Sequence, residues 1–251
     1  MRWIEAALAL GLFAGMGQAP RSLQSGPPQA ATLPTSPQNP VPPALPAPTM
    51  QPVQPRFVVV LDAAHGGSDP GAKLGDAVPE KDITLQLAGR LRSMLRARGI
   101  DVTMIRQGDV TMAPLDRAEA VNHAQAAACL VIHATATGSG VHLFTSSLAP
   151  AARAQFLPWQ TAQAAYVTQS LKLESELDTA LAHAEVPVTL GRASVEPMDS
   201  MACPEVAVEL APLVAGHVTT AKPITDMGYE TSVVNAIAAA LESWRSDWKQ
   251  S

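Results

Sequence analysis

Four side chains that could act together on a bound metal lie far apart in the sequence. They are His65, Glu80, His133 and Glu209. Two imidazoles and one carboxylate are a common ligand set of catalytic zinc sites, which keep the fourth position open for water. A second carboxylate beside such a site can take a proton from that water and later give it to a leaving group. The residue types therefore indicate metal-assisted hydrolysis, provided that the fold brings the four together.

Each of these residues also has a simpler interpretation when it is taken alone. A histidine in a loop is usually structural or solvated, and Glu80 at the start of a helix could serve the helix dipole. Glu209 is harder to explain in this way, because it lies inside the apolar run 207–210. A buried carboxylate costs several kcal/mol unless a cation or hydrogen bonds compensate it. Glu209 is therefore the most informative of the four.

Alternating strand-like and helix-like segments provide a frame for these residues. The nearly all-apolar run 56–62 precedes the glycine-rich loop 65–67, which is typical of a strand buried on both faces. Glu80 opens a helix whose apolar residues recur at spacings of three and four, and Gly99 is well placed to end it. Further strands are predicted at 100–106, 129–133, 141–145 and 205–210, and further helices at 114–126, 159–184 and 233–244.

The order strand, helix, strand, helix, strand indicates an α/β domain with a largely parallel sheet. Ligands of such sheets bind beyond the carboxyl ends of the strands. His65 follows the first strand, His133 ends the third, and Glu209 lies near the end of the fifth. The helix that Glu80 opens starts on the same edge. We therefore expect one rim of the sheet to carry all four residues.

At these residues the chain resembles a known family. Residues 56–245 are similar to the zinc-dependent N-acetylmuramoyl-L-alanine amidases of the third amidase family, which are cell-wall hydrolases. The segments that carry the resemblance are VVVLDAAHGGSDPGA, PEKDITLQLAGRLRSMLRARGIDV, LDRAEAVNHAQAAACLVIHATA and CPEVAVELAPL, in the family's order and spacing. The resemblance implies a single α/β domain with a twisted, mostly parallel sheet flanked by helices on both faces.

The resemblance also implies a role for each of the four residues. Zn²⁺ would be bound by His65, Glu80 and His133, and Glu209 would be the catalytic general base and acid. The expected reaction is hydrolysis of the amide between N-acetylmuramic acid and the L-alanine of the stem peptide in peptidoglycan. Two alternatives remain. One is an exported peptidoglycan-binding or regulatory domain that keeps the fold and the zinc but has little activity. The other is a zinc hydrolase of a different amide.

The sequence departs from the family pattern beside three of these residues. Ala63-Ala64 stands where Pro-Gly usually precedes the first histidine. Thr135 replaces an asparagine after the second histidine, and Ala211-Pro212 replaces Gly-Phe after the catalytic glutamate. These positions belong to the surroundings of the site, so we expect a divergent member with altered specificity or lower activity.

Several other residues could take part but have simpler interpretations. His142 follows the His133 strand closely and could support the site. His123 is interpreted as a surface or cap residue, and Trp159 could stack weakly on sugar. Arg106 and Arg117 are interpreted first as members of structural pairs.

The N-terminal part of the chain differs in character from the rest. The apolar run 6–16 follows a positive charge and precedes small residues, which indicates a signal peptide over 1–19 or an uncleaved N-terminal anchor. Residues 20–55 hold twelve of the 22 prolines, a composition that predicts a Pro-rich disordered linker. Residues 56–251 then form the zinc amidase catalytic domain. We expect an exported protein of the periplasm or cell envelope, with a membrane tether if the N-terminus is retained.

Charge and composition narrow the choice of partners. The formal net charge of −5 argues against sequence-independent nucleic-acid binding, which needs a basic face. Peptidoglycan is the expected partner, and a protein activator is a further candidate. Some members of the family carry an inserted helix that covers the zinc site until a partner removes it. The segment 146–171 could form such a helix, although packing on the sheet is the simpler interpretation.

The two cysteines, Cys129 and Cys203, lie in or beside apolar strand-like runs. The simpler interpretation is that both are small buried hydrophobic side chains. Export would permit a disulfide between them, but the sequence does not test their separation.

Overall fold

The computed structural model describes residues 56–75, 78–151, 156–216 and 220–248. The predicted signal peptide or anchor and the predicted linker lie outside these residues. None of the described helices is both long and apolar enough to cross a membrane.

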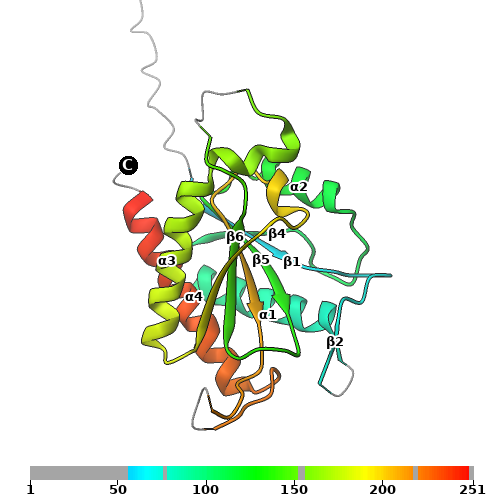
Figure 1. Cartoon of the computed structure of the whole chain (residues 1–251), viewed down its shortest axis with the longest axis vertical. Helices are drawn as coiled ribbons and strands as arrows, with labels where there is room; N and C mark the ends of the chain where they lie inside the picture. The colour runs from blue at the N-terminus through cyan, green and yellow to red at the C-terminus, as the bar shows by residue number, and fades with distance from the viewer. Residues whose placement is uncertain (1–55, 76–77, 152–155, 217–219, 249–251) are drawn as a thin grey trace, which may run out of the picture. The chain divides into compact units, whose positions relative to one another are not determined.

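A six-stranded sheet in the order β4-β1-β5-β8-β6-β7 forms the centre of the domain (Figure 1). Its strands are β1 (Val58–Ala63), β4 (Asp101–Met104), β5 (Ala128–Ala134), β6 (Val141–Ser146), β7 (Val188–Ala193) and β8 (Glu205–Leu210). Neighbouring strands run parallel except for β6 and β8, which are antiparallel. The predicted mostly parallel sheet is therefore confirmed. A small antiparallel pair, β2 (Lys73–Leu74) and β3 (Val78–Pro79), lies between β1 and the first helix in the chain.

Helices cover both faces of the sheet. The α-helices are α1 (Glu80–Ala97), α2 (Pro114–His123), α3 (Val167–His183) and α4 (Met227–Trp248), and two 3₁₀ helices are η1 (Trp159–Ala165) and η2 (Met198–Ser200). Helices α1, α3 and α4 pack on one face, with α3 and α4 side by side (Figure 1). Helix α2 and η2 pack on the other face. The α/β class and the helices on both faces agree with the expectation.

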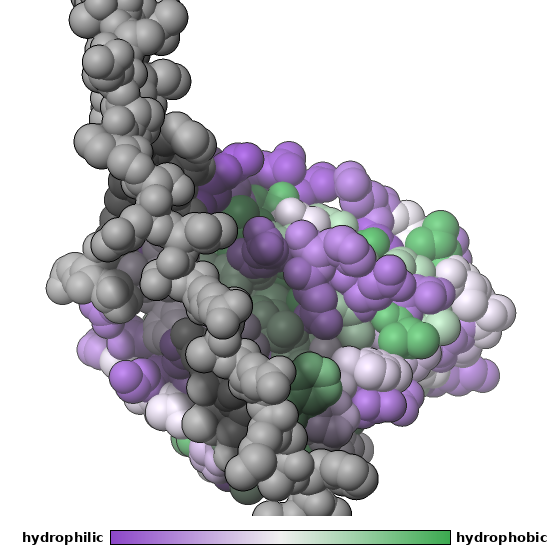
Figure 2. All heavy atoms as spheres, turned by 90° about the horizontal axis from the view of Figure 1, so that it is seen from above, coloured by the Kyte–Doolittle hydropathy of each residue, from purple (hydrophilic) through white to green (hydrophobic). Residues whose placement is uncertain are grey.

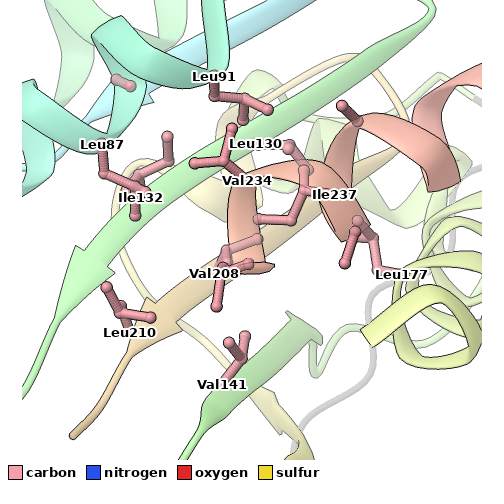
Figure 3. Packing of buried hydrophobic residues seen from close by; sticks show 14 of the residues in the cluster. Leu87, Leu91, Leu130, Ile132, Val141, Leu177, Val208, Leu210, Val234 and Ile237 are labelled. Carbon is pink, nitrogen blue, oxygen red and sulfur yellow. The ribbon is translucent and has the colours of Figure 1, made fainter. Parts of the chain in front are cut away.

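The larger hydrophobic core lies between the sheet and the helices α1, α3 and α4. Figure 3 shows leucine, isoleucine and valine side chains from both layers pointing toward one another, among them Leu91 of α1, Leu130 of β5, Val208 of β8 and Ile237 of α4. Full burial of one such side chain stabilises the fold by about 1.5–3 kcal/mol. This core holds the sheet as a rigid platform whose carboxyl edge can carry a site.

A smaller core lies on the opposite face and contains a disulfide. Val60, Val131 and Ala207 of the sheet meet Met198 of η2, and Cys129 is bonded to Cys203 with their Cα atoms 6.2 Å apart. The preferred interpretation of two unlinked hydrophobic cysteines was wrong. Strands β5 and β8 are neighbours in the sheet, so Cys129 of β5 and Cys203, two residues before β8, come into bonding range although 74 positions separate them.

Three element predictions need correction. The helix expected over 159–184 is interrupted, because Thr161 has φ −124° and ψ 25° inside η1 and α3 begins only at Val167. Gln163 of η1 donates hydrogen bonds to the carbonyls of Met201 and Cys203, so tertiary contacts hold this segment away from regular α-helix. Strand β7 was not predicted, since it is half exposed and lacks an apolar run. Helix α4 begins at Met227 rather than at 233.

The described part of the segment 146–171 packs on the domain. Ser146 ends β6, η1 contacts η2, and Gln163 is fully buried. Residues 152–155 lie outside the described residues.

Viewed from above, the surface shows hydrophobic patches separated by hydrophilic side chains (Figure 2). Leu115 and Trp159 are among the exposed large apolar side chains, and both line one pocket beside α2.

Candidate metal site

The loop after β1 presents His65 at the carboxyl edge of the sheet. His65 has a φ of 62°, a left-handed conformation that non-glycine residues adopt only when the surroundings enforce it. Arg117 donates to the carbonyl of His65 at 2.5 Å. Lys81 donates to the carbonyl of Gly67 at 2.9 Å, and the Gly67 N–H donates to Asp109 at 2.6 Å. These bonds fix the loop that carries the first predicted ligand.

His65, Glu80 and His133 are brought together by the fold. One ligand atom from each lies within 4.8 Å of the other two, and no other group of this kind exists among the described residues. Nε2 of His65 is 3.1 Å from Oε2 of Glu80, and Nδ1 of His133 is 3.0 Å from Oε1. The two imidazole rings meet edge to face with their centroids 5.4 Å apart. The structure thus brings these three residues, which are distant in the sequence, together at one edge of the sheet, as predicted.

Glu80 is the most tightly held of the three. It is the first residue of α1 and is only 5% exposed. Its carboxylate accepts backbone N–H groups of Ala72 at 3.0 Å and Ala134 at 3.1 Å. Burial alone would raise the pKa of Glu80, but the hydrogen bonds from His133, His65 and these two N–H groups lower it far below its usual value. A permanently ionised carboxylate therefore faces the two imidazoles.

Asp69 is a member of the site that the sequence reasoning missed. Its Oδ2 lies 2.8 Å from Nδ1 of His65, and its Oδ1 accepts the N–H of Gly71. The bond with Glu80 raises the pKa of His65, burial opposes this, and the bond with Asp69 raises it further. A carboxylate on the distal nitrogen of a histidine is the usual outer support of a metal-ligating imidazole. The spacing of four residues after His65 was the available signal.

Glu209 lies next to His133, one of the three candidate ligands, but is less buried than expected. It pairs in register with His133 across β5 and β8, and its side chain is 29% exposed. Oε2 of Glu209 is 2.7 Å from Nδ1 of His142 on β6. The fully buried carboxylate of β8 is instead Glu205, at 0% exposure. The sequence argument for a functional Glu209 assumed that its carboxylate is fully buried. This assumption was wrong, because the fully buried carboxylate of β8 is that of Glu205.

A pocket of about 250 Å³ opens next to His133 and Glu209. Its lining is mostly apolar and comes from the four strands β5, β6, β7 and β8, from the segment before η2 and from η2 itself, with Val131, Phe144, Ala193, Val195, Pro197, Met198 and Ala207 among the residues. Both titratable residues are on the same face of the sheet as this lining, since alternate residues of a strand share a face. The arrangement places a water-excluding surface beside polar groups that could do chemistry.

Comparison with known proteins shows to which family this chain belongs. A family model described as Amidase_3, N-acetylmuramoyl-L-alanine amidase, matches residues 59–243. The chain belongs to this family. The matched range includes all four residues of the site and all six strands except the first residue of β1.

Individual members of the family are similar over parts of the chain. N-acetylmuramoyl-L-alanine amidase AmiA of Escherichia coli (strain K12) is 37% identical over 106 residues, which are 40% of this chain and 37% of that protein. The germination-specific N-acetylmuramoyl-L-alanine amidase of Bacillus subtilis (strain 168) is 34% identical over 33% of this chain and 40% of its own. The chain thus spans less than half the length of these relatives.

Solved structures support the fold. The N-acetylmuramyl-L-alanine amidase Ami1 of Mycobacterium smegmatis aligns with a TM-score of 0.61 and 20% identity, over 76% of this chain and 97% of its own. At this identity the likeness concerns the fold alone.

The residues that depart from the family pattern form hydrogen bonds within this chain. The carbonyls of Ala63 and Ala64 accept hydrogen bonds from Arg106 at 2.8 and 3.1 Å. The carbonyl of Ala211 accepts the hydroxyl of Tyr229 at 2.8 Å. Arg117 forms an ion pair with Asp62, as expected of a structural pair, whereas Arg106 donates to backbone carbonyls and to the Thr84 hydroxyl. Both contact the loop that carries His65 and so support the site as well.

Proposed function

We propose that this protein is a zinc-dependent N-acetylmuramoyl-L-alanine amidase. It hydrolyses the amide between N-acetylmuramic acid and the L-alanine of the peptidoglycan stem peptide. The observation that carries the proposal is the convergence of His65, Glu80 and His133 within 4.8 Å beside the carboxylate of Glu209, in a chain of the amidase family.

The donor set fits zinc. Two nitrogens and one carboxylate are the ligands of many catalytic zinc sites, which leave a coordination position open. Asp69 bonds the Nδ1 of His65, so the Nε2 that faces Glu80 is the nitrogen available to a metal. His65, Glu80 and His133 would hold the zinc ion, which would supply Lewis acidity toward the scissile carbonyl and the attacking water.

The other steps fall to the protein's own residues. Glu209, as a carboxylate, accepts a proton from the attacking water while the oxygen of that water bonds to the carbonyl carbon. Glu209 then donates the proton to the amide nitrogen as the carbon–nitrogen bond breaks. The products are a carboxylic acid on the lactyl group and a free amine on L-alanine. The apolar pocket beside His133 and Glu209 excludes bulk water from this proton transfer.

The experiment that tests the proposal uses the full chain on isolated peptidoglycan, with mass spectrometry of the soluble products. We expect intact stem peptides, released from unbroken glycan, and loss of release when a chelator removes the metal. Release of disaccharide fragments would identify a different bond. Zinc binding without release of peptides would favour the alternative, a wall-binding or regulatory domain with little activity.

Variants separate the roles of the site residues. We expect His65→Ala, Glu80→Ala and His133→Ala to lose bound zinc together with activity. Glu209→Gln should lose activity and keep its zinc, because the glutamine is nearly isosteric but cannot take up a proton. Metal content by atomic emission measures the difference. Full activity of Glu209→Gln would remove this residue from the mechanism.

The N-terminal predictions complete the proposal. We propose that residues 1–19 direct export to the periplasm or cell envelope and that residues 20–55 tether the catalytic domain. A Pro-rich arm extends by about 3.1 Å per residue and would let the domain reach across a polymer mesh. Fractionation of cells with the N-terminal sequence of the mature protein tests this. A processed N-terminus would identify a cleaved signal, and an intact one in the membrane fraction an anchor.

A further inference from the structure

We propose that His142 is a positioning residue for Glu209. Its Nδ1 lies 2.7 Å from Oε2 of Glu209, and a proton on this nitrogen holds the carboxylate in one orientation for proton transfer. This inference rests on the proposed function, in which Glu209 is the base, and assigns a role to a residue outside the predicted set of four.

The direction of β6 explains how His142 reaches the site. Strand β6 is antiparallel to β8, and His142 lies directly opposite Glu209 in the register of the two strands. The beginning of β6 therefore lies at the same sheet edge as the end of β8. Directly opposed side chains on one face have Cβ atoms about 4.5–5.5 Å apart, which is within reach of an imidazole–carboxylate bond.

The imidazole of His142 is itself held in place. A Cβ atom at Gly138 would lie 2.3 Å from Cε1 and 2.4 Å from Nε2 of the ring, so the Gly138 backbone packs directly against the edge that points away from Glu209. Phe144 meets the ring edge to face at 6.5 Å. The His142 side chain is only 13% exposed. These contacts leave the Nδ1 side of the ring directed at Glu209.

A fixed imidazole has a specific effect on Glu209. The terminal torsion of a glutamate is broad and roughly two-fold, so a carboxylate that is 29% exposed would sample many orientations without a partner. An ionised carboxylate only accepts hydrogen bonds, so Nδ1 of His142 must carry the proton. The bond occupies Oε2 and leaves Oε1 as the oxygen that is free to accept a proton from water.

The test compares His142→Leu, which removes the donor, with His142→Asn, whose amide N–H can occupy the place of the Nδ1–H. We expect His142→Leu to lower kcat on the order of 10- to 100-fold, the usual loss when the outer partner of an active-site group is removed. KM, zinc content and Tm should stay near the wild-type values, and His142→Asn should recover most of the lost kcat. His123→Leu, which removes an exposed histidine of α2, is the matched control and should retain wild-type kcat.

A second measurement does not depend on activity. Long-range ¹H–¹⁵N NMR of the full chain reports which imidazole nitrogen carries the proton. We expect the Nδ1-protonated form for His142 in the wild type and a changed signal in Glu209→Ala. This NMR measurement also tests the inference if the His142→Leu variant does not fold.

The outcomes separate the inference from the proposed function. Wild-type kcat in His142→Leu, or an Nε2-protonated His142 that does not respond to Glu209→Ala, would overturn the inference while the amidase assignment stands. If the wild type releases no stem peptides but His142 is Nδ1-protonated and responds to Glu209→Ala, the amidase assignment fails and the positioning contact holds.

Discussion

Arg117 and Asp62 form an ion pair next to the candidate metal site, with Nη1 of Arg117 2.5 Å from Oδ1 of Asp62. Their side chains are only 6% and 1% exposed. The same guanidinium donates to the carbonyls of Ala63 and His65. One buried cation thus joins the end of β1 to the loop that carries the first candidate ligand.

Removal of this cation should damage both stability and metal binding. We expect Arg117→Leu to lower the free energy of unfolding by about 3–5 kcal/mol, because it leaves the buried carboxylate of Asp62 without its partner. Zinc affinity should fall as well, since the His65 carbonyl loses its donor. Urea denaturation and a zinc titration measure the two effects. The double variant Arg117→Leu/Asp62→Asn should lose less stability than the sum of the single variants, and strict additivity would argue against the pair.

Gly71 packs against the candidate ligands, so a methyl group there should displace them. A Cβ atom at Gly71 would lie 2.7 Å from Oε2 of Glu80 and 2.7 Å from Cδ2 of His65. We expect Gly71→Ala to weaken zinc binding on the order of 10- to 100-fold, as changes in the support of metal ligands do. Competition with a chromophoric chelator gives the affinity.

Gly75 provides the matched control for this change. Its φ of +47° is also left-handed, but a Cβ atom there would meet nothing within 4 Å. Gly75→Ala should therefore cost about 1–2 kcal/mol of backbone strain and leave zinc affinity unchanged. Equal losses of affinity in both variants would show that backbone strain, and not contact with the ligands, is responsible.

Glu205 should make stability depend on pH. Burial raises the pKa of Glu205 well above 4.5, and the charges of Asp199 and Asp62 raise it further. Neither carboxyl oxygen has a hydrogen-bond partner. Between pH 4.5 and the raised pKa, the folded protein binds a proton that the unfolded chain releases, so stability falls as pH rises through this window.

We expect Glu205→Met to raise the free energy of unfolding by about 1–3 kcal/mol at neutral pH, since it removes an unsatisfied buried group. The gain should become smaller as pH falls toward 4.5, where the unfolded carboxyl also begins to bind a proton, and the part that is due to the unpaired neutral carboxyl should remain. Thermal melts from pH 4 to 8 measure it. Glu119→Met, on the exposed surface of α2, should show no such trend. A Glu205→Met protein less stable than the wild type at pH 8 would contradict the interpretation.

The disulfide should contribute strongly to stability. Cys129 and Cys203 close a loop with a sequence separation of 74, for which the chain-entropy relation gives about 4 kcal/mol. We expect a reductant to lower the Tm of the wild type. The double variant Cys129→Ala/Cys203→Ala should melt at a lower temperature and not respond to the reductant. A wild-type Tm that is unchanged by full reduction, with free thiols confirmed by alkylation, would show that the bond contributes little.

Part of the candidate site could be predicted because it follows from strand order. His65 and His133 come at the ends of runs that are almost entirely apolar, and such runs are typical of buried parallel strands. Since the carboxyl ends of parallel strands meet at one edge, the positions of β1 and β5 in the sequence were enough to place these side chains close together. Glu80 was placed by the same rule, as the first residue of the helix that starts at this edge.

The support of Glu209 could not be predicted in the same way. The apolar pattern of β6 is the same whether the strand runs parallel or antiparallel to its neighbour, so the sequence does not indicate that His142 lies opposite Glu209. The short connection 135–140 between β5 and β6 favours the antiparallel direction, because a parallel crossover needs a dozen or more residues, but it does not tell which strand β6 pairs with. Only the register of β6 on β8 decides the contact.

Local sequence determined where strands and helices alternate, which residues could bind a metal, and the family to which the segments belong, because these depend on residue type and short-range spacing. Tertiary structure alone decided which carboxylate of β8 is buried, that Cys129 meets Cys203, and that η1 is held in a non-α conformation by the backbone of 201–203. Each of these depends on which distant segment covers a given strand. Strand periodicity specifies the face of a residue, but not what packs upon it.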